Sequence, residues 1–477
     1  MADGFHRLSH LPGSCTRVKI PGPSCHRGRR QGPVGAVVAQ GKNPLGEPGV
    51  GSTGGSNRPV PSRGDVLRAR GRVLGRFIVL VVLLVIGSLK LGHQWGDVFT
   101  GARGPFPAAF APGAPVAPDR VVRRTTDEQA LVHGLSVRWT GSGVTAMNLR
   151  TGEEYWRYER REPKAVVGES AVSERTVVVG HNDGRLVGID LRSGKLLWRV
   201  DVREDGFRFV HLAGGQVVTG APGAVRAFDE RDGRSLWTLK VSESCPVVLV
   251  VSAHALPDHL SVVHVMCNVT SLDRDGYNLL LGVDNRTGEA VWRQRTVDPE
   301  QMAWGDGHTL VTSDPERPVQ LLDMNRQGTS RRAALPPDEW DVVAAGSGTV
   351  LTGTDPKEDS DDHDTVLHAY DSRDGRRSWQ LRAPTGQEYG FPAIADGRVY
   401  VVCQPLLTAA DAGRRIQSDL VILDADTGRR LHTLRLPAMT APDDSDDFGK
   451  LDVLDTGDGA VSIGWRDGGG DLLVATD

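Results

Sequence analysis

The chain has 477 residues, of which 58 are Gly and only 5% are aromatic, and its formal net charge is −4. This length fits one large all-β domain with attached segments. The charge is uneven, because residues 1–76 hold 13 Lys and Arg against 3 Asp and Glu, whereas the remainder holds 43 against 57, a net charge of −14. A negative charge of that size argues against nucleic-acid binding by the larger part.

Residues 1–76 are rich in Gly, Pro, Ser and Arg and show no sustained hydrophobic periodicity. Such a segment cannot bury enough apolar surface to offset the entropy lost on ordering. We therefore predict a disordered basic tail.

The one long apolar run covers residues 77–89, and its extension through Lys90 to Trp95 gives a span of 19 residues. At about 1.5 Å per residue, that length approaches the roughly 30 Å thickness of a bilayer core. Five Arg precede the run, namely Arg63, Arg68, Arg70, Arg72 and Arg76. By the positive-inside rule we predict a single transmembrane helix at 77–95, with the tail in the cytoplasm and the rest extracytoplasmic.

A cleaved signal peptide is the alternative to this anchor, with the small-residue sequence at 109–111 as its cleavage site. That site lies far beyond the apolar run, and the preceding region is long for a signal peptide, so we favour an uncleaved anchor. Residues 96–118 are dense in Pro and Ala, which predicts a semi-rigid linker that holds the next domain away from the membrane.

From residue 119 to residue 477 one motif recurs, as in "AMNLRTGEEYW", "GIDLRSGKLLW", "AFDERDGRSLW", "GVDNRTGEAVW" and "AYDSRDGRRSW". Its acidic or amide position occurs eight times, at separations of 39 to 55 residues. Each unit reads as four short strands separated by Gly and Asp turns, which describes one antiparallel blade. The sequence predicts an all-β, eight-bladed β-propeller of four-stranded blades, with seven blades as the alternative.

The motif has a structural interpretation. An Asp side chain can accept N–H bonds from the turn that follows it, and the Gly can take a positive φ. The Trp then lies on the outer strand, where its ring can pack between blades. The residues concerned are Asn148, Gly152, Trp156, Asp190, Gly194, Trp198, Asp229, Gly233, Trp237, Asp284, Gly288, Trp292, Asp371, Gly375, Trp379, Asp424 and Gly428.

The last unit ends after its third strand, whereas residues 119–125 form an unassigned strand ahead of the first unit. We expect this N-terminal strand to complete the last blade, because pairing there would remove an exposed edge.

The repeated motif resembles the tryptophan-docking motif of the pyrroloquinoline quinone (PQQ) repeat family. The resemblance covers residues 120–477 and implies the propeller fold. It leaves the activity open, since that family includes quinoprotein dehydrogenases, a scaffold lipoprotein of outer-membrane-protein assembly, and sensor domains. Many of the dehydrogenases bind PQQ with calcium and carry adjacent Cys or a C-x-x-C-H haem motif, and both motifs are missing here.

Three further groups of residues are candidates for sites. Cys245 and Cys267 bracket two β-rich runs, which suits either a cross-strand disulfide or two separate buried thiols. The acidic stretches 355–365 and 441–449 lack the Gly and distal Glu of a calcium loop and read as solvated loops. His254, His259 and His264 are five residues apart and would point to opposite faces of a strand, against a shared metal.

The sequence thus favours a non-enzymatic, membrane-anchored bacterial propeller that binds a protein, peptide or glycan outside the cytoplasm. A PQQ-dependent oxidoreductase, which would use PQQ and calcium, and an extracytoplasmic sensor are the alternatives. No catalytic, cofactor-binding or metal residue is assigned.

Overall fold

The computed structural model describes residues 96–110, 120–125, 129–162, 167–202, 209–242, 245–267, 277–296, 302–305, 307–314, 317–336, 339, 341–353, 366–408, 411–442, 450–457, 459–465 and 471–475. In these ranges the regular elements are strands, and no helix is long and apolar enough to cross a membrane. The predicted tail (1–76) and transmembrane helix (77–95) lie outside them, as do the acidic stretch 355–365 and most of 441–449.

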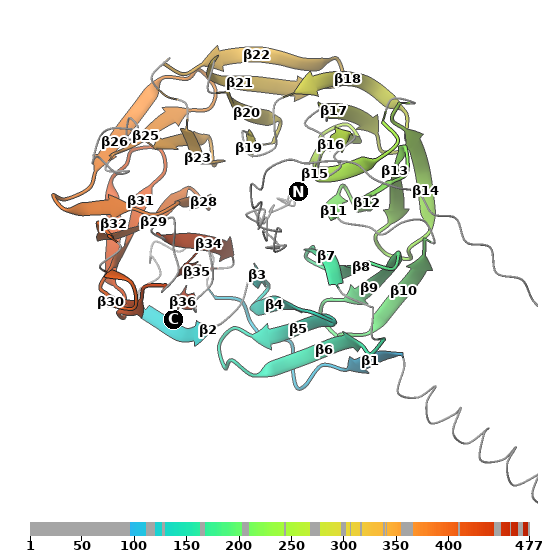
Figure 1. Ribbon diagram of the computed structural model, residues 1–477, viewed down its shortest axis with the longest axis horizontal. Coiled ribbons are helices and arrows are strands. Elements are labelled where there is room, and N and C mark those ends of the chain that lie inside the picture. The colour runs from blue at the N-terminus through green and yellow to red at the C-terminus, as the bar shows by residue number, and fades with distance from the viewer. Residues whose placement is uncertain are drawn as a thin grey trace, which may run out of the picture. The chain divides into compact units, whose positions relative to one another are not determined.

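The described strands form a ring of eight blades, as the eight-copy repeat predicts, and each blade is built around four antiparallel strands (Figure 1). Blade 1 contains β3 (Gln129–Val132), β4 (Leu135–Thr140), β5 (Gly143–Asn148) and β6 (Glu154–Arg160); blade 2 contains β7 (Val167–Val172), β8 (Thr176–His181), β9 (Arg185–Asp190) and β10 (Leu196–Asp201); blade 3 contains β11 (Val210–Ala213), β12 (Gln216–Ala221), β13 (Ala224–Asp229) and β14 (Ser235–Lys240); blade 4 contains β15 (Val248–Leu256), β16 (Leu260–Cys267), β17 (Tyr277–Asp284) and β18 (Ala290–Thr296).

The second half of the ring follows the same plan. Blade 5 contains β19 (Met302–Trp304), β20 (Thr309–Asp314), β21 (Arg317–Asn325) and β22 (Gly328–Ala334); blade 6 contains β23 (Asp341–Gly346), β24 (Thr349–Gly353), β25 (Val366–Asp371) and β26 (Arg377–Arg382); blade 7 contains β27 (Gln387–Tyr389) and β28 (Ala393–Ala395), which both pair with β29 (Arg398–Pro405), then β31 (Asp419–Asp424) and β32 (Arg430–Arg435); blade 8 contains β34 (Leu451–Gly457), β35 (Ala460–Trp465), β36 (Asp471–Ala475) and β2 (Arg120–Thr125). β30 (Arg415–Ile416) and β33 (Met439–Thr440) pair with each other as a two-stranded antiparallel ribbon.

The hydrophobic core lies between neighbouring blades. The second strand of a blade is covered on both faces, so all six residues of β8 are buried. The outermost strand is covered on one face, and β10 accordingly alternates exposed residues with the buried Trp198. Because consecutive strands are antiparallel, the turns within strand pairs one–two and three–four lie on one face of the ring, here called the turn face. The links between blades and the loops between strands two and three lie on the opposite, connection face.

The ring closes as the sequence predicts. β2 lies beside β36 as the outer strand of blade 8, where Val121 pairs with Val474 (Figure 1). The last blade therefore takes three strands from the C-terminus and one from the N-terminal side. This pairing leaves the ring without an open seam at its chain ends.

The expected spacer differs from the structure over residues 97–110, which lie on the propeller. β1 (Asp97–Thr100) adds a fifth strand to blade 1 by pairing with the outer edge of β6 (Figure 1). Residues 101–110, here called the strap, then cross the turn face, and Phe110 is only 1% exposed. Composition predicted a linker because Pro and Ala disfavour regular structure, but three Phe in this segment supply apolar contacts that Pro and Ala content does not register.

Cys245 and Cys267 form a disulfide, with their Cα atoms 5.0 Å apart. Cys245 lies in the link between blades 3 and 4, and Cys267 ends β16. The bond therefore joins that link to the second strand of blade 4 on the connection face. Cys403 is a buried free thiol.

Candidate functional site

The repeated motif forms a corner between the third and fourth strands of a blade. In blade 2, Asp190 Oδ1 accepts the Ser193 N–H at 2.8 Å, and the Gly194 N–H donates to the Asp190 carbonyl at 2.9 Å. Gly194 takes a φ of 65°, and a Cβ there would come within 2.6 Å of the Trp156 side chain. The backbone bond recurs in the other corners, where the side-chain oxygen accepts an N–H from two or three residues further on; these are Asn148 and Gly152, Asp229 and Gly233, Asp284 and Gly288, Asp371 and Gly375, and Asp424 and Gly428.

The motif Trp wedges each blade against the next. Its indole N–H donates to the backbone carbonyl of the residue that follows the next blade's motif acid. This bond joins Trp156 to Leu191 (2.7 Å), Trp198 to Glu230 (2.7 Å) and Trp379 to Ala425 (2.8 Å). In blade 5 the acceptor is one residue further on, since Trp292 donates to the carbonyl of Asn325 (2.8 Å), two residues after Asp323. The geometry gives the motif residues an architectural role at these four junctions.

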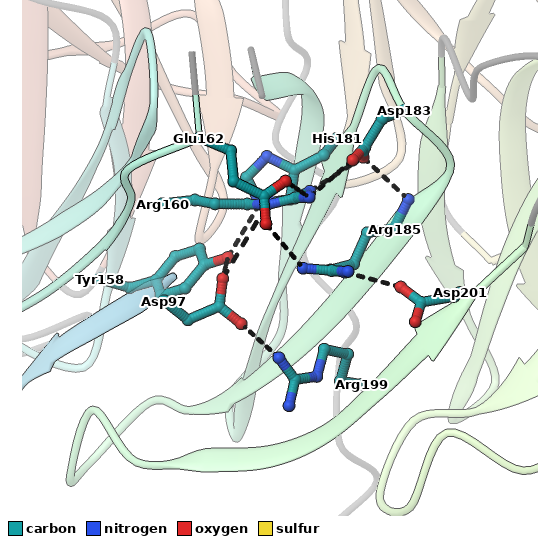
Figure 2. Close-up of polar contacts among 9 residues, drawn as sticks. All are labelled: Asp97, Tyr158, Arg160, Glu162, His181, Asp183, Arg185, Arg199 and Asp201. Carbon is teal, nitrogen blue, oxygen red and sulfur yellow. Dashed lines mark hydrogen bonds and ion pairs between the residues drawn. The ribbon is translucent and has the colours of Figure 1, made fainter. Parts of the chain in front are cut away.

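A buried polar cluster closes the connection face between blades 1 and 2 (Figure 2). Arg160, at the end of β6, is 1% exposed, and its guanidinium donates two hydrogen bonds to Asp183, at 2.9 and 2.6 Å. A further bond joins Arg160 to Glu162. On the other side of Arg160, Tyr158 donates to Asp97 Oδ1 at 3.3 Å and contacts His181 Nε2 at 2.9 Å.

The cluster also holds β1 in place. Arg199 of β10 bonds Asp97 Oδ2 at 2.9 Å, and Arg185 bonds Asp201 at 2.6 Å. The first residue of β1 is thereby bound to both blades at once. The carboxylates, the terminal guanidinium nitrogens and the phenol pair with one another, which makes a buried charge tolerable, whereas Arg160 Nε and His181 Nδ1 are buried without a hydrogen bond among the described residues.

The environment of the cluster shifts its ionisable groups strongly. Burial, and then the Asp97 carboxylate, raise the pKa of Tyr158 above its usual range. Burial, reinforced by the charge of Arg160, lowers the pKa of His181 to about 4. The hydrogen bond from Arg160 lowers the pKa of Asp183. Shifts of this kind mark either active sites or ion-pair networks, and here each partner is another structural group of the same junction.

A second buried polar group lies in blade 6. Glu339, which is 4% exposed, accepts a hydrogen bond from Thr352 Oγ1 and contacts His368 Nδ1. The three residues come from the link before β23, from β24 and from β25. They brace the strands of one blade on the connection face.

The junction between blades 3 and 4 departs from the repeat on the turn face. The indole N–H of Trp237 donates to Gln216 Oε1 at 3.1 Å instead of a backbone carbonyl. Gln216 Nε2 in turn donates to the Asn285 carbonyl at 2.7 Å. A glutamine side chain therefore stands between the Trp and its usual acceptor.

A groove of about 1000 Å³ opens at this departure. Its lining comes from turns of blades 3, 4 and 5 and comprises Gly214, Gln216, Ala255, Leu256, Pro257, Asp258, His259, Asn285, Arg286 and Arg326. Arg326 is anchored at one end, because it donates to the Asp258 carbonyl at 3.1 Å and to Asp284 Oδ2 at 2.6 Å. The groove thus has apolar, cationic, anionic and amide groups side by side.

One turn in the groove wall is conformationally unusual. The β15–β16 turn places Asp258 and His259 at φ values of 60° and 56°. The His259 carbonyl accepts an N–H from the residue after the motif acid, as the carbonyls of Gly134, Gly215, Gly348 and Gly397 do in blades 1, 3, 6 and 7. Those four positions are Gly with positive φ, whereas blade 4 holds His in the same left-handed conformation. A strained non-Gly residue points to a functional constraint.

Several polar groups of the groove have no partner within the described part of the chain. The Arg286 guanidinium makes no hydrogen bond or ion pair with another described residue, and Asn285 Oδ1 is buried without one. A buried polar atom without a hydrogen bond is costly, so Asn285 Oδ1 suits contact with a ligand, and the exposed Arg286 guanidinium is available to the same ligand.

Sequence reasoning assigned no residue to this groove, although one signal was present. The turn "PDHL" from Pro257 lacks the Gly that ends the equivalent turns "HG", "GG", "SG" and "DG", as do the turns of blades 2 and 5 that end at Arg175 and His308. The contribution of Gln216 has no such signal, since it depends on the position of Trp237 across a blade junction.

A family model described as outer membrane protein assembly factor BamB matches residues 140–279 and 276–446. The chain belongs to the BamB family. This membership confirms the resemblance to PQQ-like repeat propellers inferred from the motif.

Curated relatives of this BamB-family chain fall into two groups. A quinohemoprotein alcohol dehydrogenase from Pseudomonas putida is 33% identical over 118 residues, covering 20% of this chain and 16% of that protein. Outer membrane protein assembly factor BamB from Nitrosomonas eutropha is 28% identical over 157 residues, covering 33% of this chain and 34% of that protein. The chain therefore spans about a third of the length of one of these relatives and about a sixth of the other.

Among solved structures, BamB from Moraxella catarrhalis superposes with a TM-score of 0.46 at 14% identity, covering 75% of this chain and 99% of that chain. A computationally designed protein, Ika8, gives a TM-score of 0.47 at 13% identity.

Proposed function

We propose that the chain is a membrane-anchored, extracytoplasmic scaffold whose propeller binds another protein through the groove on the turn face of blades 3 to 5. The observation that carries this proposal is the coincidence, at one groove, of two departures from the repeat and an unpaired cation. The departures are the Gln216 side chain, which lies between Trp237 and the Asn285 carbonyl, and the left-handed His259; the cation is Arg286. In a repeat fold, positions that break the pattern without a structural gain are candidates for function.

Two observations support export. The disulfide between Cys245 and Cys267 suits an oxidising compartment, since thiols in the cytosol are kept reduced. The apolar run and its preceding Arg residues fit an anchor whose C-terminal side is exported. The relative named as an outer membrane protein assembly factor adds an example of a family member whose named role is assembly.

A PQQ-dependent oxidoreductase is the second candidate, favoured by the similarity to a quinohemoprotein alcohol dehydrogenase. In the described ranges no three His, Cys, Asp or Glu side chains come together as a metal site would require. We therefore assign no residue of this chain to calcium or to the quinone, and derive no reaction step through them.

The test uses the full-length protein. A photocrosslinking amino acid at Pro257, in the groove, is expected to join the chain to a specific protein in intact cells. The same amino acid at Arg161, exposed on the connection face, is the matched control and is expected to give no such product. Protease added to spheroplasts should digest the propeller, in keeping with export.

The purified protein is also mixed with PQQ and calcium and assayed for a visible-absorbance complex and dye-linked alcohol oxidation. Oxidation that requires PQQ would overturn the scaffold proposal in favour of the enzyme. Equal crosslinking from Pro257 and Arg161 would contradict the turn-face site.

A further inference from the structure

The turn face of blades 1 and 2 already holds an extended peptide, namely the strap. Arg150 stands two residues after the motif Asn148, and its Nε and Nη2 lie 3.4 and 3.2 Å from the carbonyl oxygens of Ala108 and Ala109. Its Cζ lies 4.3 Å from the centre of the Phe110 ring. One guanidinium therefore binds both the backbone and an aromatic side chain of the strap.

Blade 2 contacts the strap in a similar way. Arg192 also stands two residues after its motif acid, Asp190, and its Cζ lies 4.6 Å from the Phe106 ring centre. The carbonyl of the next residue, Ser193, accepts the Ala102 N–H at 3.1 Å. Each of these motif corners thus offers a cation to an aromatic ring, and the backbone contacts fix an extended chain.

Blades 3 and 4 present the same corners. Arg231 and Arg286 occupy the position two residues after Asp229 and Asp284, and neither side chain pairs with another described residue. In blade 1, a Cβ on Gly134 would come within 2.6 Å of the Ala108 carbonyl oxygen, which shows how closely the strap passes. A Cβ on the equivalent Gly215 of blade 3 would meet nothing within 4 Å.

We infer that the groove binds an extended peptide segment of a partner protein with an aromatic side chain, held as the strap is held. Arg286 donates to a backbone carbonyl and stacks on the aromatic ring. Leu256 and Pro257 supply apolar contact, and the Asp258 carboxylate accepts an N–H of the peptide. This inference rests on the proposed scaffold function and names the chemistry of its partner.

The presence of both free donors and free acceptors favours a peptide over a simple anion. Arg326 is already paired with Asp284, and the lining holds the carboxylate of Asp258 as well as the guanidinium of Arg286. The groove therefore has little net charge, and a peptide backbone, which offers one donor and one acceptor per residue, matches it better than a phosphate would.

The experiment selects short random linear peptides, displayed on phage, against the full-length protein in detergent. Enriched peptides are synthesised with a fluorophore, and their Kd is measured by fluorescence anisotropy. We expect every enriched peptide to contain Phe, Tyr or Trp. Arg286→Ala is expected to weaken binding about tenfold, because it removes a charged hydrogen bond and a cation–π contact.

The matched control is Arg373→Ala. Arg373 has the same motif position in blade 6 but is paired with Asp371, so its loss is expected to leave Kd unchanged. Replacing the aromatic residue of the peptide by Ala should cost the same factor as Arg286→Ala, and the two changes together little more than either alone.

Enriched peptides that bind Arg286→Ala as well as the wild type would overturn the inference. So would a failure to enrich any peptide, or binding of an oligosaccharide panel in place of peptides. If Pro257 still crosslinks to a protein in cells while no aromatic peptide is enriched, the peptide chemistry is wrong and the scaffold function stands. If both fail, the scaffold proposal fails as well.

Discussion

The junctions between blades 1 and 2 and between blades 3 and 4 are built from the same repeat, but the first is covered on its turn face and the second is open there. At the first, Trp156 docks on a backbone carbonyl, the strap covers the turn face, and a buried ionic cluster closes the connection face. At the second, Trp237 reaches a glutamine, a groove opens on the turn face, and a disulfide closes the connection face. The difference shows that the motif fixes the ring, while the segment lying on the turn face determines whether a corner is covered or available.

The largest expected effect separates a structural Arg from a binding Arg. Arg160→Ala empties a buried position and removes a hydrogen-bond donor from Asp183 and Glu162, whose side chains are 39% and 38% exposed. We expect the cavity and the lost hydrogen bonds to lower the free energy of unfolding by about 2–5 kcal/mol. Denaturant unfolding, followed by Trp fluorescence, measures the change.

Arg286→Ala is the matched variant for that measurement. Its side chain is exposed and unpaired among the described residues, so we expect its unfolding free energy to stay within about 0.5 kcal/mol of the wild type. Equal losses for the two variants would show that both junctions are structural and would remove the contrast between them.

The second effect tests the disulfide of blade 4. Replacing both Cys245 and Cys267 by Ser opens a loop whose ends are 22 residues apart, which should lower the unfolding free energy by about 2–4 kcal/mol. Adding a reductant should lower the melting temperature of the wild type and leave that of the double variant unchanged. If reductant left the melting temperature of the wild type unchanged, the disulfide would not stabilise the fold.

The third effect is a dependence of stability on pH. Burial and the charge of Arg160 lower the pKa of His181 from 6.5 to about 4, and burial lowers the pKa of His264 likewise. Because these folded-state values lie below that of the unfolded chain, the unfolded chain takes up protons first as the pH falls. Stability is therefore complete above pH about 6.5 and is lost as the pH falls toward about 4.

Proton uptake by the unfolded chain at each of these histidines should lower the unfolding free energy by about 2 kcal/mol between pH about 7 and pH about 5. His181→Gln should remove the contribution of His181 to this pH dependence of the unfolding free energy. Denaturant unfolding at a series of pH values measures it. If His181→Gln left the pH dependence of the unfolding free energy unchanged, His181 would not be one of the groups that cause it.

The contrast between the two junctions also shows what the sequence could and could not predict. The fold was predictable because Asp190, Gly194 and Trp198 act locally, through a turn and a neighbouring blade, and the repeat multiplies that signal. The docking of residues 97–110 was not, since Phe106 and Phe110 gain their partners only when Arg192 and Arg150 line up on a closed ring. The groove was missed for the same reason, because Gln216 meets Trp237 and Asn285 across a junction that no spacing reveals.

The smallest effect bears most directly on function. His259 has a φ of 56°, where an L-residue is strained and Gly is not. His259→Gly should therefore raise the unfolding free energy by about 1 kcal/mol or less, after the entropy cost of Gly is counted, and it should weaken peptide binding at the groove. The reciprocal change, Gly348→His, puts the same strain into the equivalent turn of blade 6, which should lose stability without any effect on peptide Kd. If His259→Gly stabilised the protein and left peptide Kd unchanged, the strain would have no use in binding, and Arg286 alone would distinguish the open junction from the closed one.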